Sequence, residues 1–406
     1  MPSVLPYDII AQIIDNVGEN NDISLIKELA LVSHSFHEIC SKHLFATVDL
    51  HDNFPMRHGS SKKGFVKLLK RRPEVVKYIR KLTYNVEYGR FRSQASSTYY
   101  DDNLLLPDLP NFLRTISFLN CLTITTSKMV DWYTVDPSLT SAFLHLMHLP
   151  SINHIVLSSI EDFPLSSLTS SVNLRRLDIF HLHLIIEEDD FSKIVVLSEM
   201  MPKIREFNST GSSLLTRKLL HAERQDGRPA FNFMDLRRFS TCIEDARNLR
   251  YLLQNAKLLE KLHLSATPYG SFWGLHDILS PSAHTLKELA VTVSVYSAPP
   301  PLGRLCEEVE AMAGDNMLEA LSFELLADNC EAEYFIGSKI RNVAEVLVKP
   351  GWSALRQVSF KVSIAGSRYN FDELMEELES IPDKYLSHLS KPESIAFSYE
   401  YKFEHD

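Results

Sequence analysis

The 406-residue sequence has few of the residues and motifs on which catalytic and metal sites usually depend. Its five cysteines are widely scattered and form no CxxC pair, which argues against a zinc site and a disulfide framework. Only 13 glycines occur, and the common motifs of phosphate loops, dinucleotide sites, serine hydrolases and metalloproteases are missing. The sequence therefore predicts a protein that is not an enzyme and that has no cofactor or metal.

Long hydrophobic stretches are also missing from the sequence. No run approaches the roughly 18 apolar residues of a membrane span. The N-terminus lacks the basic and apolar regions of a signal peptide. Because unpaired cysteines fit a reducing compartment, we expect a cytoplasmic or nuclear protein with no membrane partner.

The composition is that of an ordinary globular protein, with 45% hydrophobic and 23% charged residues. The net charge of −10 argues against nucleic acid as a partner of the whole molecule. However, the segment Arg57 to Arg92 holds 12 Lys or Arg residues and only two Glu. It is either a solvated face, a docking site for an acidic protein, or a nucleic-acid site. Its central cations are Lys67, Lys70, Arg71, Arg72, Lys77, Arg80 and Lys81.

Three short helices are predicted in the first 50 residues. Pro6 suits the first turn of a helix, Gly18 suits its end, and Asp22 and Ser33 can cap the next two helices. The first helix has an apolar stripe formed by Ile9, Ile10, Ile13, Ile14 and Val17. Because three helices of this length bury little surface, we expect one side to lean on the downstream chain and the other to be free for a partner.

These helices carry two sub-motifs of the F-box family in the right order. Leu5-Pro6 followed by Asp8-Ile9-Ile10 resembles the opening helix of an F-box, and the segment LALVSHSF from Leu29 to Phe36 resembles its core motif. Phe36 stands where that family often has Trp, and Tyr7 where a small or polar residue is usual. The resemblance implies docking on a Skp-type adaptor of an SCF ubiquitin ligase. The docking residues that it implies are Leu5, Pro6, Ile9, Ile13, Leu29, Val32 and Phe36.

Downstream, a short apolar pattern recurs at intervals of roughly 22 to 40 residues. It has the form apolar-x-x-apolar-x-apolar, as in Leu174/Leu177/Ile179 and Leu259/Leu262/Leu264, and it resembles the strand segment of leucine-rich repeats. Such triples also arise by chance, so the stronger signal is the helical segments between them. We expect an irregular α/β solenoid with parallel strands and with helices on the opposite face. The alternative is a globular α/β domain with a parallel sheet.

The predicted fold is therefore an α+β chain in three parts: an F-box-like helical domain at 1–50, a linker and short helix at 51–75, and a leucine-rich-repeat-like array at 76–406. Three segments are predicted as loops within the array, at 88–106, 215–232 and 296–303. Long loops on a repeat scaffold are either binding insertions or excursions without a role.

Residues between the leucines of each triple should face the open side of the sheet, because strand side chains alternate. In the middle repeats these residues are His154, Arg176, Asp178, Glu206, Arg238, Lys261 and His263. One hypothesis is that Arg176, Arg238 and Lys261 form a pocket for an acidic or phosphorylated segment of a target. The alternative is a solvated face on which Asp178 and Glu206 pair the cations.

Other histidines and acids have simpler explanations. His145 and His148 are three residues apart on a predicted helix, a spacing that can hold a metal, but no acidic or sulfur ligand is near in sequence. His181 and His183 are interpreted in the same way, as surface histidines. The acidic run at 187–190 suits a helix N-terminus better than a cation site.

The predicted function is that of a substrate receptor in an SCF-type ubiquitin ligase. The helical head would tie the chain to the ligase core through the adaptor, and the array would hold a target protein. The alternative is a leucine-rich-repeat interaction scaffold with no ubiquitin role.

Overall fold

A computed structural model describes residues 6–20, 22–51, 61–86, 106–183, 200–224, 226–242, 246–266, 274–295, 302–314, 316–328, 336–365, 376, 378–386 and 395–404. The chain forms two compact units. Unit 1 comprises residues 1–202 and 222–230, and unit 2 comprises residues 203–221 and 231–406. None of the helices in the described ranges is long and apolar enough to cross a membrane.

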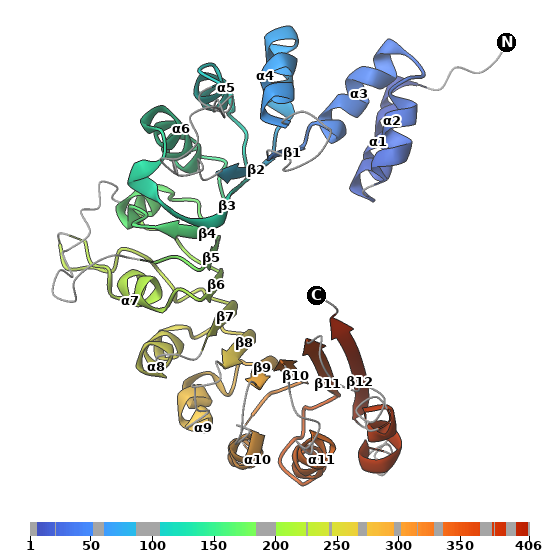
Figure 1. Ribbon diagram of the computed structural model, residues 1–406, viewed down its shortest axis with the longest axis vertical. Helices are drawn as coiled ribbons and strands as arrows, with labels where there is room; N and C mark the ends of the chain where they lie inside the picture. Colours follow the sequence, from blue (N-terminus) through green and yellow to red (C-terminus); the bar gives the residue numbers. More distant parts are fainter. Residues whose placement is uncertain are drawn as a thin grey trace, which may run out of the picture. The chain divides into compact units, whose positions relative to one another are not determined.

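Unit 1 starts with three helices and continues as alternating strands and helices (Figure 1). The three helices of the head are α1 (Tyr7–Glu19), α2 (Ile23–Leu29) and α3 (His34–Leu44). The strands are β1 (Thr47–Leu50), β2 (Lys81–Val86), β3 (Cys121–Asp131), β4 (His154–Glu161) and β5 (Arg176–Phe180). The helices beside them are α4 (Ser61–Arg71), η1 (Pro73–Tyr78), α5 (Leu109–Thr115), η2 (Trp132–Thr134), α6 (Pro137–Met147) and η3 (Leu165–Ser170).

Unit 2 repeats the alternation of strands and helices. Its strands are β6 (Glu206–Thr210), β7 (Arg238–Cys242), β8 (Lys261–Ala266), β9 (Glu288–Val295), β10 (Ala320–Asp328), β11 (Gln357–Ala365) and β12 (Ala396–Glu404). Its helices are α7 (Ser213–His221), α8 (Ala246–Asn255), α9 (Leu275–Leu279), η4 (Ser280–Ser282), α10 (Leu302–Ala311), α11 (Ile336–Leu347) and η5 (Pro382–Leu386).

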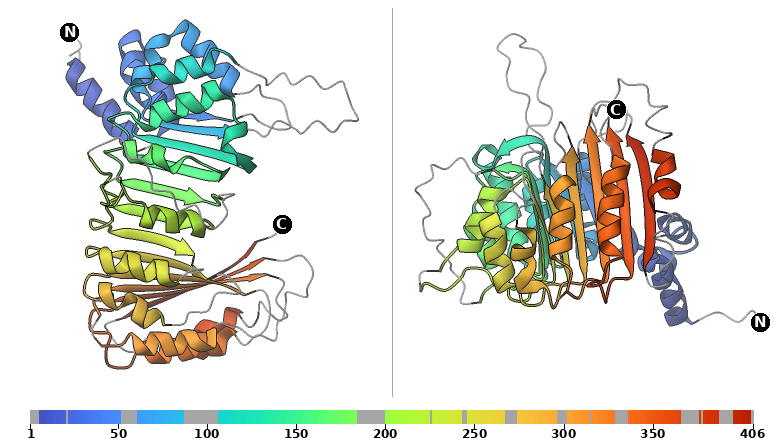
Figure 2. Two further views of the ribbon diagram at one scale, coloured as in Figure 1. Left: turned by 90° about the vertical axis from the view of Figure 1, so that its left-hand side faces the viewer. Right: turned by 90° about the horizontal axis from the view of Figure 1, so that it is seen from below.

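Within each unit every strand pairs in parallel with the next strand along the chain. In unit 1 the register runs Thr47↔Lys81, Lys81↔Cys121, Cys121↔His154 and His154↔Arg176. In unit 2 the same order continues through every strand from β6 to β12. The helices lie against one face of these strands (Figure 2). The predicted array of parallel strands alternating with helices is confirmed.

A shared backbone hydrogen bond marks the start of strands β2 to β5 and β7 to β11. Two consecutive N–H groups donate to one carbonyl oxygen of the preceding repeat, as Asn120 and Cys121 do to Arg80 at 2.7 and 3.0 Å. The acceptor carbonyls are Ala46, Arg80, Asn120 and Asn153 in unit 1, and Arg205, Arg237, Glu260, Lys287 and Glu319 in unit 2. Because each of these strands donates to the repeat before it, its register is fixed from its first residue.

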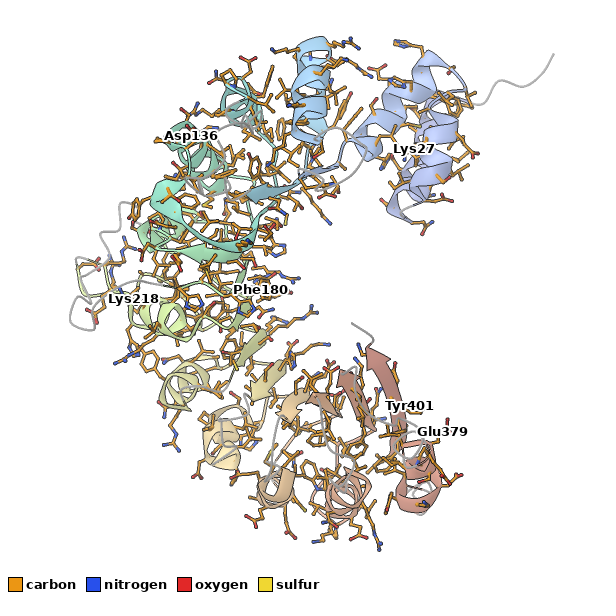
Figure 3. The ribbon with its side chains drawn as sticks, viewed as in Figure 1. Lys27, Asp136, Phe180, Lys218, Glu379 and Tyr401 are labelled. Atoms are coloured by element: carbon orange, nitrogen blue, oxygen red, sulfur yellow. The ribbon has the colours of Figure 1, made fainter. Side chains whose placement is uncertain are left out.

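The core of each unit lies between the strands and the helices. Leu177, Leu262 and Leu289, each the middle residue of an apolar triple, are all buried there. Aromatic rings add to this layer: Tyr84 meets Phe143 of α6 edge-to-face, and Phe323 stacks on Phe360 across β10 and β11. Phe180, on β5, instead lies on the face away from the helices (Figure 3). The alternation predicted from the triples is therefore confirmed.

Local sequence explains where the helices begin. The Asp22 carboxylate accepts a hydrogen bond from the Leu25 N–H at 3.0 Å, and the Ser33 hydroxyl accepts one from the Phe36 N–H at 3.3 Å. Asp136 caps α6 in the same way, and it is labelled in Figure 3. Both predicted caps of the head are confirmed. Gly18, predicted as the end of the first helix, lies inside α1, which continues to Glu19.

Two segments have a secondary structure that differs from the predicted one. Residues 47–50 form strand β1, so the first strand of the array lies within the segment predicted as helical. Part of the predicted loop at 215–232 is helix α7, because Leu215, Leu219 and Leu220 form an apolar stripe that is buried. Residues 88–105 and 296–301 of the other two predicted loops lie outside the described residues. The predicted division at residues 50 and 75 stays a prediction.

A pair of leucines on unit 2 tests this architecture. Leu262 is buried under the helices, whereas Leu258 lies at the surface, 45% exposed. We expect Leu262→Ala to lower the free energy of unfolding by about 2–5 kcal/mol and Leu258→Ala to lower it by less than about 0.5 kcal/mol. Denaturant unfolding followed by circular dichroism measures both. Equal effects of the two variants would contradict the layered core.

Candidate partner-binding surfaces

The three helices of the head have a hydrophobic core of their own. Ile14, Ile26, Ala30, Ile39 and Cys40 are buried in it, and further apolar side chains are packed against them. These partly buried residues are Ile10, Ala11, Val17, Leu29, Phe36 and Leu44. Burial raises the pKa of the Cys40 thiol. The inward-facing apolar positions of all three helices are therefore used within the head.

The head carries a second set of apolar side chains, on α1, on α2 and in the turn before α3, and these are exposed. This head apolar set comprises Tyr7, Ile9, Ile13, Ile23, Leu25, Leu31 and Val32. Leu31 is 86% exposed and Val32 is 65% exposed. The set makes up seven of the 17 exposed large hydrophobic residues in the described part of the chain. Because single exposed hydrophobic residues are ordinary but a concentration of them is not, the head is a candidate partner-binding surface.

The residues implied by the F-box resemblance fall into two groups. Pro6, Ile9, Ile13 and Val32 are exposed, whereas Leu29 and Phe36 are half-buried against the core of the head. Leu5 lies outside the described residues. The sequence analysis did not assign Leu31, Tyr7, Ile23 or Leu25 to adaptor docking. The available signal was stripe width, because an apolar stripe containing both Ile9/Ile13 and Ile10/Ile14 is too wide to be buried on one side of a helix.

A close contact joins α1 to α3. The His43 ring lies so near Gly18 that a side chain at this position would collide with it. Asp15 accepts hydrogen bonds from the Lys42 ammonium at 2.8 Å and the His43 ring at 2.7 Å. Burial opposes the charge of Asp15, but these bonds outweigh it and hold the pKa of the carboxyl below its usual range. Gly18 therefore permits the approach that orients the two helices.

Cations of the predicted basic segment are partly paired within unit 1. Lys70 forms an ion pair with Asp108 at 2.6 Å, and Arg72 forms one with Glu74 at 2.9 Å. A guanidinium nitrogen of Arg72 also lies 2.7 Å from the His37 ring, on α3. Lys62 is buried, with its ammonium over the Tyr84 ring. These contacts favour the interpretation of this segment as a largely structural, solvated face.

On the open face of unit 1, three predicted target-binding residues come together. The His154 Nε2 and the Arg176 Nε both lie by the same oxygen of Asp178, at 2.8 and 2.9 Å. The Asp178 side chain is only 6% exposed, although it was predicted on the open face. It is buried because the histidine and arginine lie over it, and together they compensate its charge.

His154 is held in its charged form by this arrangement. Burial opposes a charge on the ring, but hydrogen bonds with Asp178 and Cys121 outweigh it and raise the pKa of His154 to about 9. The ring therefore carries a proton near neutral pH.

The open face of unit 2 places Arg238 and Lys261 on neighbouring strands, in register. Arg238 forms an ion pair with Glu206 at 3.5 Å, and Lys261 forms one with Glu288 at 2.5 Å. His263 lies between the hydroxyls of Ser240 and Thr292, at 3.2 and 2.9 Å. Burial lowers the pKa of His263, against the attraction of Glu324.

The contacts of the three cations bear on the predicted pocket. Arg176 belongs to unit 1, and Arg238 and Lys261 belong to unit 2; each faces a carboxylate of its own unit. This is the pairing that the alternative interpretation expects, and a pocket formed by all three stays a prediction. The sequence analysis did not consider Glu288, which is the register partner of Lys261 on β9.

One of the histidines considered as metal ligands, His148, makes a different contact. The His148 ring bonds the backbone carbonyl of Ser167 at 2.9 Å. Among the described residues, no group of three or more His, Cys, Asp or Glu side chains is arranged to hold a metal ion. The acidic run at 187–190 lies outside those residues.

No protein-family model matches the sequence, and no curated protein is significantly similar to it.

The charged state of His154 predicts a pH dependence of stability. Because the folded-state pKa of about 9 is above the ordinary value of 6.5, the protonated ring stabilises the fold fully below pH 6.5 and ceases to do so as the pH rises through 9. We expect the difference in melting temperature between wild type and His154→Gln to be largest at the acidic end of this range and to shrink toward its alkaline end. Melting curves across that range measure it. A difference that stays constant with pH would contradict the proposed charge.

Proposed function

We propose that this chain is the substrate-recognition subunit of an SCF-type ubiquitin ligase. Its head docks on a Skp-type adaptor and its strand–helix array captures a target protein. The single observation that carries the proposal is the head apolar set, seven exposed hydrophobic side chains between Tyr7 and Val32 on helices that already have a complete core. Exposed apolar surface of this concentration is typical of protein–protein contacts.

The chemistry of the head apolar set indicates what kind of partner fits. Its side chains are aliphatic apart from Tyr7, and they lie on α1, on α2 and in the turn before α3. A partner that buries them must offer an apolar surface of its own, because little hydrogen bonding is available from these side chains. The F-box resemblance of the same segment supports a Skp-type adaptor as that partner.

In this proposal the chain performs no bond chemistry. The adaptor connects the head to the ligase core, and the array holds the target near the site of ubiquitin transfer. Tethering raises the effective concentration of the target there without any new catalytic residue.

The open faces of the strands are the proposed site for the target. Their cations are held in ion pairs that are largely at the surface, such as Arg238 with Glu206 and Lys261 with Glu288. Pairs of this kind contribute only about 0–1 kcal/mol, so an acidic or phosphorylated segment can displace the carboxylates and bind the cations. The pairing also keeps these faces soluble without a target.

A repeat scaffold with no ubiquitin role is the second candidate. The parallel array supports it equally well, because repeat arrays present extended surfaces to many kinds of partner. Only the head distinguishes the two functions. Binding of a purified Skp-type adaptor to the full chain is expected for a ligase subunit and not for an independent scaffold.

Removing the most exposed part of the head apolar set tests the proposal. We expect Leu31→Ala with Val32→Ala to weaken adaptor binding by about tenfold or more, because each large apolar side chain contributes about 1.5–3 kcal/mol when fully buried. The melting temperature should change little, since both side chains are exposed. Surface plasmon resonance with immobilised adaptor measures the affinity.

Tyr133→Ala is the matched control for this variant. Tyr133 is 74% exposed and lies in unit 1, on η2, away from the head helices in the sequence. Its loss should leave adaptor affinity unchanged. If the Leu31/Val32 variant binds as tightly as the Tyr133 variant, the head is not the docking site.

A further inference from the structure

Three side chains on neighbouring strands of unit 1 form a Cys–His–Asp relay. The Cys121 sulfur lies 3.3 Å from Nδ1 of His154, and Nε2 of His154 lies 2.8 Å from an oxygen of Asp178. The three residues come from β3, β4 and β5, so the parallel register brings them together. They are 33 and 24 residues apart in the sequence, which is why no short motif reveals them.

The surroundings of the Cys121 sulfur are rich in positive charge. Lys81 is the register partner of Cys121 on one side, and His154 is its partner on the other. Arg176 follows His154 in the same row. Two carboxylates lie one row further along the open face. Asp178 is paired with His154 and Arg176, and Asp49 is on β1, two strands from β3. A partly exposed cysteine among cations is the usual environment of a reactive thiol.

His154 acts on the sulfur through its protonated ring. With the pKa of His154 raised to about 9, both ring nitrogens carry a proton near neutral pH. Nε2–H then donates to Asp178, which orients the ring, and Nδ1–H donates to the Cys121 sulfur. A charge-assisted hydrogen bond of this kind stabilises negative charge that develops on its acceptor.

The relay resembles a nucleophilic catalytic triad, but it lacks the donors that acyl transfer needs. The backbone N–H groups of Cys121, His154 and Arg176 already donate to the carbonyls of Arg80, Asn120 and Asn153. Stabilising a tetrahedral intermediate requires free donors beside the nucleophile. The three strands therefore place the Cys121 sulfur beside a protonated imidazole, and these three backbone N–H groups are not free to form an oxyanion hole.

We propose that Cys121 is a covalent modification site for small anionic disulfides. The Cys121 sulfur attacks one sulfur of the disulfide, the bond between its two sulfurs breaks, and a mixed disulfide forms on the protein. The second sulfur leaves with the electron pair of the broken bond and takes up the proton that Cys121 gave up. Cys121 is thereby oxidised and the disulfide is reduced, so no further reagent is needed. Lys81 and Arg176 attract the carboxylates of the reagent.

The chain contains its own reference thiol. Cys306, on α10, is partly exposed like Cys121, but its nearest charged neighbours include Glu310. Burial, with the repulsion of Glu310, raises the pKa of the Cys306 thiol. Its rate of modification in the same sample therefore reports on folding and on reagent quality.

The test uses the full chain and glutathione disulfide at pH 7, with the modified cysteines assigned by peptide mass spectrometry over time. We expect Cys121 to react at least about tenfold faster than Cys306. His154→Gln should reduce the Cys121 rate about tenfold and leave the Cys306 rate unchanged. Equal rates at the two cysteines of the wild type would overturn the proposal, whether or not the variant folds.

A second disulfide of opposite charge tests the reagent class. Cystamine carries two positive charges and undergoes the same exchange. The quantity compared is the rate with glutathione disulfide divided by the rate with cystamine. We expect this ratio to be higher at Cys121 than at Cys306. We expect Lys81→Gln to lower the ratio at Cys121 and to leave it unchanged at Cys306. A ratio at Cys121 no higher than at Cys306 would refute the preference for anions. These rates need no adaptor, so their outcome is independent of the proposed function.

Discussion

The shared backbone hydrogen bond at the start of strands β2 to β5 and β7 to β11 is the constraint on which the rest of the structure depends. Two N–H groups meet one carbonyl of the repeat before, and the buried residue just ahead of them, such as Leu119 or Leu259, anchors this turn in the core. Each of these strands then starts in register with the strand before it, so its inward side chains meet the helices and its outward side chains form rows. The chemistry of the open faces follows from those rows.

The repeating part of this fold could be predicted from the sequence, because most repeats encode a buried apolar triple at strand spacing, as Leu174/Leu177/Ile179 does. Strand β1 could not, since four residues with one buried leucine give no periodic signal. Helix α7 was hidden because its apolar residues lie among charged ones. The Cys121–His154–Asp178 relay arises only from register across three strands, and the burial of Asp178 arises from the side chains over it.

The apolar residues of the head are arranged differently from those of the array. Its helices have apolar residues on two sides, and one side suffices for the core that contains Ile14 and Ile26. The other side stays exposed, which is unfavourable in water unless a partner covers it. Sequence alone could predict that part of the head surface is apolar, but not which isoleucines lie there: Ile10 and Ile14 point inward, whereas Ile9 and Ile13 are exposed.

The central claim is that the head apolar set docks on a Skp-type adaptor. Isothermal titration calorimetry of the full chain with the purified adaptor at several temperatures tests it most directly. The account predicts a one-to-one complex whose heat-capacity change is negative, because burying apolar surface on binding has that sign. The absence of a complex, or a complex whose heat-capacity change is near zero, would contradict it.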